Sequence, residues 1–183
     1  MVIKLDDSLS LELLNEDHAQ AMFKLIDFNR AHLKVWLPWV GHMQSVENFI
    51  DHIADCKKKE TEGTDYAFAI RMNDEMIGRI GIHNIDLRNK IASLGYWLAD
   101  GYQGKGIITK ASRELTNHCF HELGMNRIEI KCATGNSKSR AIAEKLHFKK
   151  EGILRQAELV NGEFLDLCVY SMLKEEWKLE DGS

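Results

Sequence analysis

The chain has 183 residues, of which 44% are hydrophobic and 28% are charged, and its formal net charge is −4 at pH 7. This length suits one domain with a buried core, so residues 1–183 are predicted to form a single domain. The acidic balance argues against a general nucleic-acid binder, which would carry a basic face. The sequence has no apolar run of about 18 residues and no apolar stretch of the signal-peptide type at its N-terminus, so we expect a cytoplasmic protein without a membrane partner.

The cysteines and histidines show no metal-ligand pattern. Cys56, Cys119, Cys132 and Cys168 are far apart and lack the C-x-x-C spacing of zinc sites. The eight histidines likewise show no ligand spacing. Reduced, mostly buried thiols and no metal are therefore expected.

The first part of the chain is predicted to form a strand and two helices. The strand covers Ser10–Leu14, and the acids after Asn15 are typical of a helix start. Pro38 interrupts an apolar segment, which favours a loop there. Ser45 is a plausible N-cap for the second helix, which has apolar residues at helical spacing.

Three strands are predicted in the middle of the chain. Apolar residues fill Tyr66–Ile70, Met76–Ile85 and Ala92–Leu98, and the polar residues 73–75 indicate a hairpin turn between the first two. This succession favours an antiparallel arrangement of the three segments.

The last part alternates helices and strands. A long helix is expected from about Gly106 to Leu123, a strictly alternating strand at Arg127–Cys132, and another helix that opens at Asn136 or Ser137. Asn161-Gly162 then predicts a final hairpin. The order of all elements indicates an α+β domain around one mixed sheet.

A glycine-rich loop precedes the long helix and is the clearest functional signal. The loop carries Gly104 and Gly106, which allow the backbone to approach a ligand closely. The first turn of the helix behind it offers unpaired N–H groups and the positive end of the helix dipole. We therefore assign pyrophosphate binding to Gln103, Gly104, Lys105, Gly106, Ile107 and Ile108, mainly through main-chain N–H groups.

Two familiar nucleotide motifs are excluded. The dinucleotide fingerprint requires a third glycine where Thr109 stands. The phosphate-binding loop of NTPases requires Lys and Ser/Thr where Ile107 and Ile108 follow Gly106. The loop therefore lacks the lysine and the magnesium ligand of that motif.

At this loop the chain resembles the GNAT superfamily of N-acetyltransferases. Its motif [Q/R]-x-x-G-x-[G/A] is matched by Gln103 and Gly106, whereas Ile108 departs from the last position and should point away from the ligand. The resemblance covers nearly the whole chain. It implies a mixed, mostly antiparallel sheet of about seven strands with about four helices, in which splayed central strands form the acyl-CoA cleft.

Within the superfamily the chain looks most like the RimJ/RimL type of ribosomal-protein N-terminal acetyltransferase. That resemblance implies acetyl-CoA as co-substrate, no metal, a primary amine as acceptor, most simply the N-terminus of a ribosomal protein, and a homodimer or higher homo-oligomer. The matching stretches are Leu37–Val40, Gly95–Leu98, Tyr102–Gly106, Asn136–Arg140 and Glu158–Gly162.

The resemblance also implies roles for single residues. A main-chain N–H near Leu98 would face the thioester carbonyl as an oxyanion donor, and Asn136 would contact the pantetheine arm. Ser139 would protonate the leaving thiolate, with Tyr102 and Tyr170 as rivals for that role. Glu158 would accept the proton of the amine, directly or through water.

Several alternatives remain open at this level. Lys105, Lys110 and Arg140 are each candidates to pair with the ribose phosphate. Trp39 is predicted at the cleft edge and Trp97 in the core. Direct attack by the amine needs no covalent enzyme intermediate. The alternative acceptor is a polyamine, amino acid or antibiotic, and a non-catalytic acyl-CoA sensor is the alternative outside the enzyme class.

Overall fold

The computed structural model describes residues 1–177, in which eight strands form one sheet in the order β1-β2-β3-β4-β5-β6-β8-β7. Only β5 and β6 run parallel, and every other neighbouring pair is antiparallel. The strands are β1 (Val2–Lys4), β2 (Leu9–Leu13), β3 (Tyr66–Met72), β4 (Glu75–Asp86), β5 (Ile91–Leu98), β6 (Arg127–Ala133), β7 (Lys149–Val160) and β8 (Glu163–Leu173).

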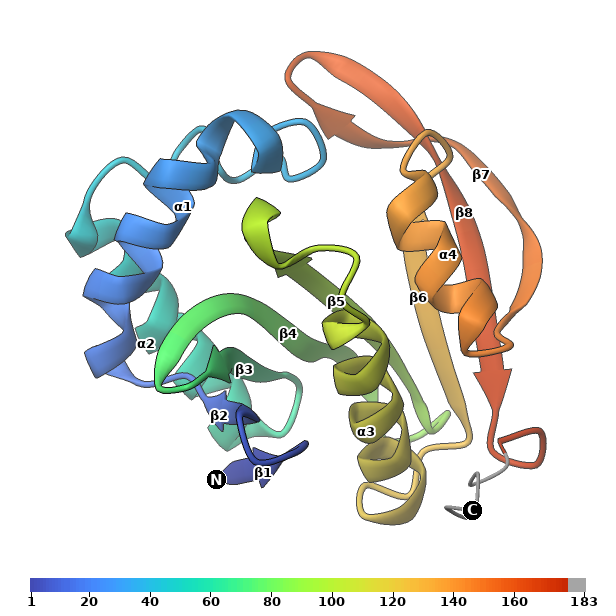
Figure 1. Ribbon diagram of the computed structural model, residues 1–183. Coiled ribbons are helices and arrows are strands. Elements are labelled where there is room, and N and C mark those ends of the chain that lie inside the picture. The colour runs from blue at the N-terminus through green and yellow to red at the C-terminus, as the bar shows by residue number, and fades with distance from the viewer. Residues whose placement is uncertain (178–183) are drawn as a thin grey trace.

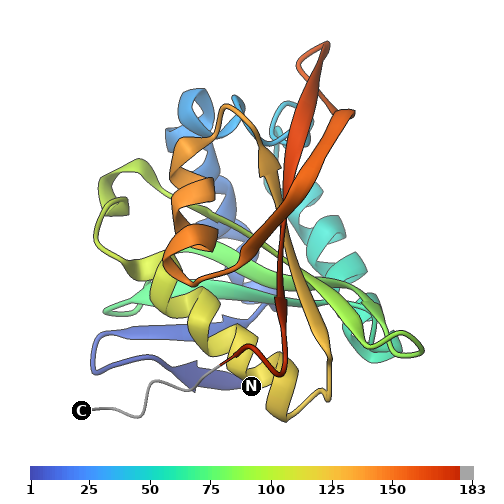
Figure 2. The same cartoon turned by 90° about the vertical axis from the view of Figure 1, so that its right-hand side faces the viewer.

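Four α-helices cover the two faces of this sheet: α1 (Ala19–Leu33), α2 (Val46–Glu62), α3 (Ile107–His121) and α4 (Ser137–Lys145). Figure 2 shows α3 and α4 together on one side of the sheet, with α2 on the other. Each face has its own apolar core, because α3 and α4 pack in one cluster of buried residues and α1 and α2 in another. None of the described helices combines the length and the apolarity needed to cross a membrane.

The predicted fold class is confirmed, with one strand more than expected. The additional strand is β1, which pairs with β2 from Val2 to Lys4. Three residues are too few to produce the alternation by which a strand is recognised in a sequence. The predicted boundaries of the other strands and of the helices lie close to the observed ones.

Local signals in the sequence explain where helices and turns occur. Asn15 and Ser45 each form a capping box, ahead of a short 3-10 turn (Glu16–His18) that leads into α1 and ahead of α2. The β7–β8 turn has positive φ at both Asn161 and Gly162, as expected for this dipeptide in a type I′ hairpin.

The central feature of the sheet is the divergence of β5 from β6 (Figure 1). The two strands pair over four positions, from Ile91–Arg127 to Leu94–Ile130. Beyond these positions β5 pairs only with β4, and β6 only with β8. The sheet therefore opens into two halves, and the expected splay of the central strands is confirmed.

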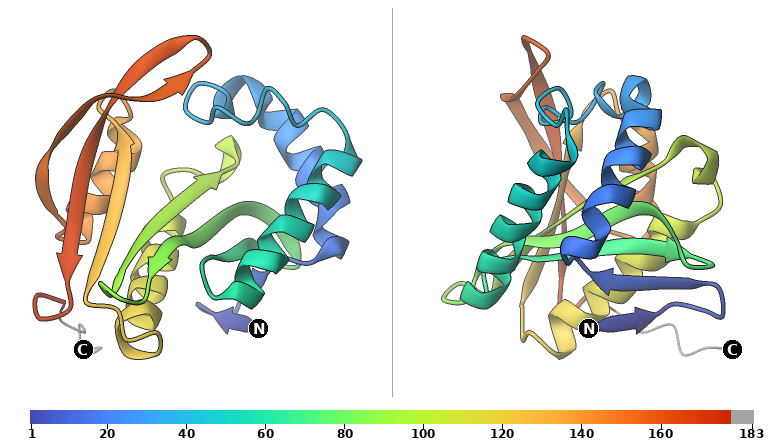
Figure 3. Two further views of the ribbon diagram at one scale, coloured as in Figure 1. Left: turned by 180° about the vertical axis from the view of Figure 1, so that it is seen from behind. Right: turned by 90° about the vertical axis from the view of Figure 1, so that its left-hand side faces the viewer.

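The β7–β8 hairpin arches from the second half of the sheet toward the end of α1 (Figure 3). Asn161 Nδ2, at the tip of the hairpin, donates a 2.7 Å hydrogen bond to the carbonyl oxygen of Lys34. The register of β7 shifts between Leu154 and Glu158. Such a bulge bends a strand, and here it lies at the base of the segment that reaches across.

Candidate active site

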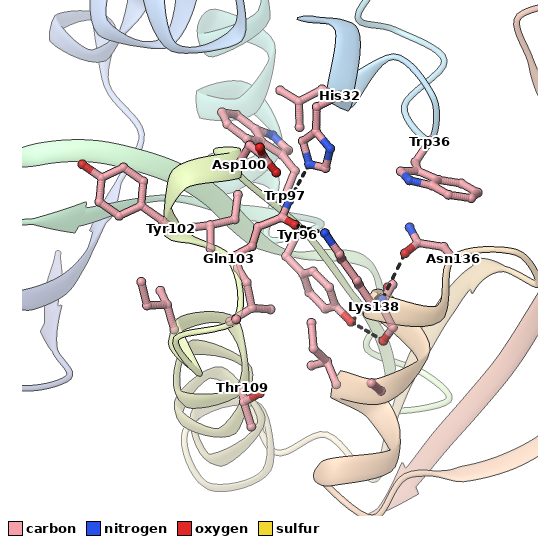
Figure 4. Close-up of a pocket in the computed structure, with 18 of the residues that line it drawn as sticks. His32, Trp36, Tyr96, Trp97, Asp100, Tyr102, Gln103, Thr109, Asn136 and Lys138 are labelled. Carbon is pink, nitrogen blue, oxygen red and sulfur yellow. Dashed lines mark hydrogen bonds between the residues drawn. The ribbon is translucent and has the colours of Figure 1, made fainter. Parts of the chain in front are cut away.

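A pocket of about 530 Å³ lies where β5 leaves β6 (Figure 4). Its walls come from the C-terminal end of α1, the end of β5, the loop before α3, the first turn of α3, and one face of α4. Of the residues assigned to the site from the sequence, the pocket is lined by Leu98, Gln103, Gly104, Gly106, Ile107, Ile108, Asn136 and Ser139.

The loop before α3 presents its backbone to this pocket. Gly104 and Gly106 have φ of 74° and 75°, which side-chain-bearing residues rarely adopt, and Gly106 is the N-cap of α3. The first helical bond that reaches back into the loop runs from the Lys110 N–H to the Gly106 carbonyl. Within residues 1–177, the main-chain N–H groups from Gly104 to Thr109 have no protein acceptor. These unpaired N–H groups are a candidate anion site, because such groups at a helix N-terminus favour negative charge.

The departure from the family motif at Ile108 does not obstruct this anion site. Ile107 and Ile108 are only 5% and 7% exposed and belong to the apolar core beneath α3. The isoleucine side chain is thus mostly buried in the core, while the backbone at the same position remains available. Lys105 lies 5.2 Å from the centre of the Tyr102 ring and is exposed.

Gln103 bridges the mouth of the pocket, as Figure 4 shows. Its side-chain oxygen accepts a 2.6 Å hydrogen bond from Lys138 Nζ, and its side-chain nitrogen donates to His32 Nε2. Three elements that are distant in sequence therefore meet at this glutamine: α1, the loop and α4. Neither His32 nor Lys138 was identified from the sequence.

The backbone of Leu98 faces the gap between the strands. The neighbouring Ala99 N–H donates to the Ile77 carbonyl on β4. Because N–H groups alternate in direction along a strand, the N–H of Leu98 points away from β4, to the side where β6 has already diverged. The side chain of Leu98 is buried in the core, so only its backbone is available for chemistry.

One face of α4 forms the opposite wall. Asn136 caps this helix by accepting a 3.1 Å hydrogen bond from the Ser139 N–H. Lys138, Ala141, Ile142 and Lys145 all line the pocket and follow the i, i+3, i+4, i+7 spacing of a single helix face. This spacing is the signal by which the two lysines were identifiable in the sequence.

The positive charge along this pocket comes from residues other than those proposed for the ribose phosphate. Lys110 forms a 2.6 Å ion pair with Asp6, and Arg140 donates to the Thr134 carbonyl. Neither residue lines the pocket, nor does Lys105. The positive charge at the pocket therefore comes from Lys138 and Lys145.

Ser139 is held by Tyr96, a residue that the sequence reading missed. Ser139 Oγ donates to the Tyr96 hydroxyl over 3.2 Å, and that hydroxyl donates to the Ser139 carbonyl over 3.2 Å. Burial raises the pKa of Tyr96, so its hydroxyl stays protonated at neutral pH. The rival tyrosines are engaged elsewhere, since the hydroxyl of Tyr102 donates to Glu75 and that of Tyr170 to Glu144.

Glu158 lies outside this pocket, on the arching part of β7. Its neighbour across the hairpin is Leu165, and its position directly follows the bulge. Within the described residues its carboxylate has neither a hydrogen bond nor an ion pair. Partial burial raises the pKa of this carboxylate, so its proton affinity is higher than that of an exposed glutamate.

Together, a sheet split between two parallel strands, a row of unpaired N–H groups at a helix start and a hydroxyl beside the gap define the class of acyl-CoA-dependent transferases. Comparisons with known proteins agree. A family model described as an acetyltransferase (GNAT) domain matches residues 8–149. The chain belongs to the GNAT family of N-acetyltransferases, whose members use acetyl-CoA as the acetyl donor.

Several relatives align over nearly their whole length. YdaF of Bacillus subtilis is 35% identical over 178 residues, which cover 97% of each chain. The ribosomal-protein-serine acetyltransferase of Escherichia coli is 33% identical over 93% of this chain and 96% of its own. A solved structure of RimL, a ribosomal L7/L12 α-N-protein acetyltransferase in complex with coenzyme A, has 31% identity and a TM-score of 0.91, covering 94% of this chain and 98% of that one.

We expect the Tyr96–Ser139 pair to contribute measurably to stability. In a Tyr96→Phe variant both hydrogen bonds disappear, so the free energy of unfolding should fall by about 1–3 kcal/mol. In Tyr102→Phe, which loses only an exposed bond to Glu75, the change should stay within about 0.5 kcal/mol. Urea denaturation of both variants checks this; equal losses would show that the pair is not a stabilising contact.

Proposed function

We propose that this chain acetylates the α-amino group of a protein N-terminus, with a ribosomal protein as acceptor. The observation that carries the proposal is the unpaired backbone at the splay: the N–H groups of Gly104 to Thr109 and the N–H of Leu98 lie around one pocket. The choice of acceptor is supported by similarity to ribosomal-protein acetyltransferases over nearly the whole chain.

In this proposal the backbone of the α3 start holds the pyrophosphate of acetyl-CoA. Lys138 and Lys145 add positive charge for the phosphates, and Asn136 lies where the pantetheine arm would pass along α4. The Leu98 N–H donates to the thioester oxygen as negative charge develops there. Acetyl-CoA supplies the activated acetyl group, and no covalent enzyme intermediate is required.

Two side chains then move protons. The Glu158 carboxylate accepts the proton that the amine loses, directly or through a water, because its oxygens are not engaged by other described groups. Ser139 donates its hydroxyl proton to the sulfur as the C–S bond breaks, and the Tyr96 hydroxyl, which accepts a hydrogen bond from Ser139 Oγ, holds the serine in position. The new bond is the amide C–N bond.

The compartment and the assembly state are part of the same proposal. All four cysteines are free, and three of them are buried, which is typical of a protein in a reducing cytoplasm. Strand β7 forms one edge of the sheet, and its hairpin exposes apolar side chains: Ile153, Leu154, Leu159 and Phe164. These features support a homodimer in which a second copy covers this hairpin.

The proposed function is tested by measuring thiol release from acetyl-CoA with a panel of acceptors. The panel contains peptides with the N-terminal sequences of ribosomal proteins, the same peptides with blocked N-termini, polyamines, amino acids and aminoglycosides. We expect product only with the free-N-terminal peptides. Turnover of a small amine, and not of the peptides, would show that the acceptor is a small molecule. Binding of acetyl-CoA without turnover of any amine would favour a non-catalytic acyl-CoA sensor.

A second prediction concerns the glycine loop. In Gly104→Ala a side chain adopts positive φ and projects beside the proposed pyrophosphate, so we expect affinity for coenzyme A to fall at least tenfold. Gly124→Ala is the matched control, since Gly124 also has positive φ and open space, but follows the other end of α3. Both variants should lose about 1–2 kcal/mol of stability from backbone strain.

Isothermal titration calorimetry with coenzyme A separates the two effects of the glycine substitutions. Weaker binding in both variants, in proportion to their stability, would show that the loop acts only through the fold.

A third prediction concerns the base. Glu158→Gln should lower kcat about 100-fold or more near neutral pH. The deficit should narrow above about pH 8, where an N-terminal amine loses its proton to solvent without help. In the wild type, the raised pKa of Glu158 means that the base form is lost at a higher pH than for an exposed glutamate as the pH falls.

The control for the base is Glu163→Gln, an exposed glutamate on the other side of the same turn, which should retain wild-type kcat. The kcat of Glu158→Gln is measured from pH 6 to pH 9, a range of ~3 units that spans the pKa of the N-terminal amine. Wild-type kcat throughout this range would contradict the assignment of Glu158 as the general base.

A further inference from the structure

A second cavity, of about 290 Å³, lies under α2 on the face of the sheet opposite to α3. The right-hand view of Figure 3 shows α1 and α2 covering this face. We propose that this cavity binds a small carboxylate through the guanidinium group of Arg79. The cavity is also lined by Trp39, His52, Cys56, Lys59 and His83.

Arg79 is a half-buried cation whose guanidinium group has no carboxylate within ion-pair distance among the described residues. The only hydrogen bond of this side chain within residues 1–177 is a weak one of 3.8 Å to Cys56 Sγ. Its Nε is fully buried and has no partner in the described chain. Arginine stays charged in proteins, and its planar fork binds a carboxylate through two parallel hydrogen bonds. A carboxylate in the cavity would use these donor positions.

The acidic groups around the cavity are already paired. Asp55 forms a 2.8 Å ion pair with Lys59, and Asp65 lies 2.9 Å from His83 Nδ1. Neither carboxylate is within ion-pair distance of Arg79 among the described residues. The fork of Arg79 therefore holds no carboxylate of the described chain, and Asp65 attracts it only from a longer distance.

The other titratable groups of the cavity add no negative charge. Burial, together with the charge of Arg79, lowers the pKa of His52 to about 4 and also lowers that of His83. Burial raises the pKa of the Cys56 thiol. At neutral pH the thiol is protonated and His52 is uncharged, so neither compensates the guanidinium.

The shape of the cavity selects a short ligand with an apolar part. Trp39, Met43 and Ala67 supply apolar wall, whereas the donors cluster around Arg79. His83 packs directly on the backbone of Gly81, where a Cβ would lie 2.8 Å from the imidazole. A carboxylate bound to the fork of Arg79, with two to four carbons against Trp39, satisfies both features.

The cavity adjoins the acyl-CoA pocket. Arg79 is paired across β4 and β5 with Trp97, whose indole Nε1 is also buried without a partner. Trp97 lines the acyl-CoA pocket and its ring lies 6.4 Å from that of Trp39, centre to centre. The carboxylate can therefore come from a free small molecule or from an acidic side chain of the acceptor peptide. The binding proposal itself does not depend on the proposed acceptor.

The test is calorimetric titration of the coenzyme A-saturated protein with propionate, with neutral propionamide as the ligand control. Saturation with coenzyme A keeps propionate out of the first pocket. We expect the wild type to bind propionate and not propionamide, and Arg79→Met to lose at least tenfold in affinity. The control variant is Arg71→Met, which removes an arginine of β3 that pairs with Glu12 on β2. This variant should bind propionate as the wild type does.

Thermal unfolding without ligand establishes that Arg79→Met is folded at the temperature of the titration. No propionate binding to the wild type at 100 mM, about 100 times a ~1 mM affinity, overturns the proposal. Arg79→Lys, which keeps the charge but not the forked donor, provides the comparison if the methionine variant does not fold.

Acetylation kinetics identify the source of the carboxylate. Peptides with Glu or Gln at positions two to four are compared in the wild type and in Arg79→Met. A lower KM for the Glu peptides that disappears in Arg79→Met assigns the cavity to the acceptor. Equal KM values together with propionate binding assign it to a free carboxylate.

Discussion

The structure depends on how few positions β5 and β6 share. Parallel pairing satisfies the backbone only from Ile91 to Leu94 on β5, and after that each strand keeps a single partner. In most sheets an unpaired stretch between two central strands is costly, because buried backbone groups require hydrogen bonds. Here the stretch opens onto a pocket, and the unpaired Leu98 N–H faces that opening, where we propose that it donates to the thioester.

The helices that follow β5 and β6 supply hydrogen-bond donors and positive charge to the opening between the two strands. The helix after β5 begins at a glycine with positive φ, which turns its unpaired N–H groups into the same pocket. The helix after β6 presents Lys138 and Lys145 from the other side. Donors and cations therefore converge on one volume because both strand–helix connections end at the edges of the same opening.

The two faces of the sheet differ in how charge is compensated. On the α3–α4 face the lysines of α4 line an open pocket, and Lys138 is already hydrogen-bonded to Gln103. On the α2 face, the half-buried Arg79 lines a cavity in which Asp55 and Asp65 contact Lys59 and His83. Trp97 lines the first pocket, and its ring packs on Trp39, which lines the second cavity.

Much of the molecule followed from the sequence, because its signals are local. Caps at Asn15 and Ser45, the Asn161-Gly162 turn and the glycines before α3 act within a few residues. Apolar segments, alternation and turn residues together predicted seven of the eight strands. The family motif added the acyl-CoA loop. The contacts of Gln103 with His32 and Lys138, and of Tyr96 with Ser139, were decided only by the tertiary structure. So were the position of Glu158 outside the pocket and the guanidinium group of Arg79 without a carboxylate in contact. These features join segments tens of residues apart, and which side chains meet there is set by strand register and helix packing, not by local spacing.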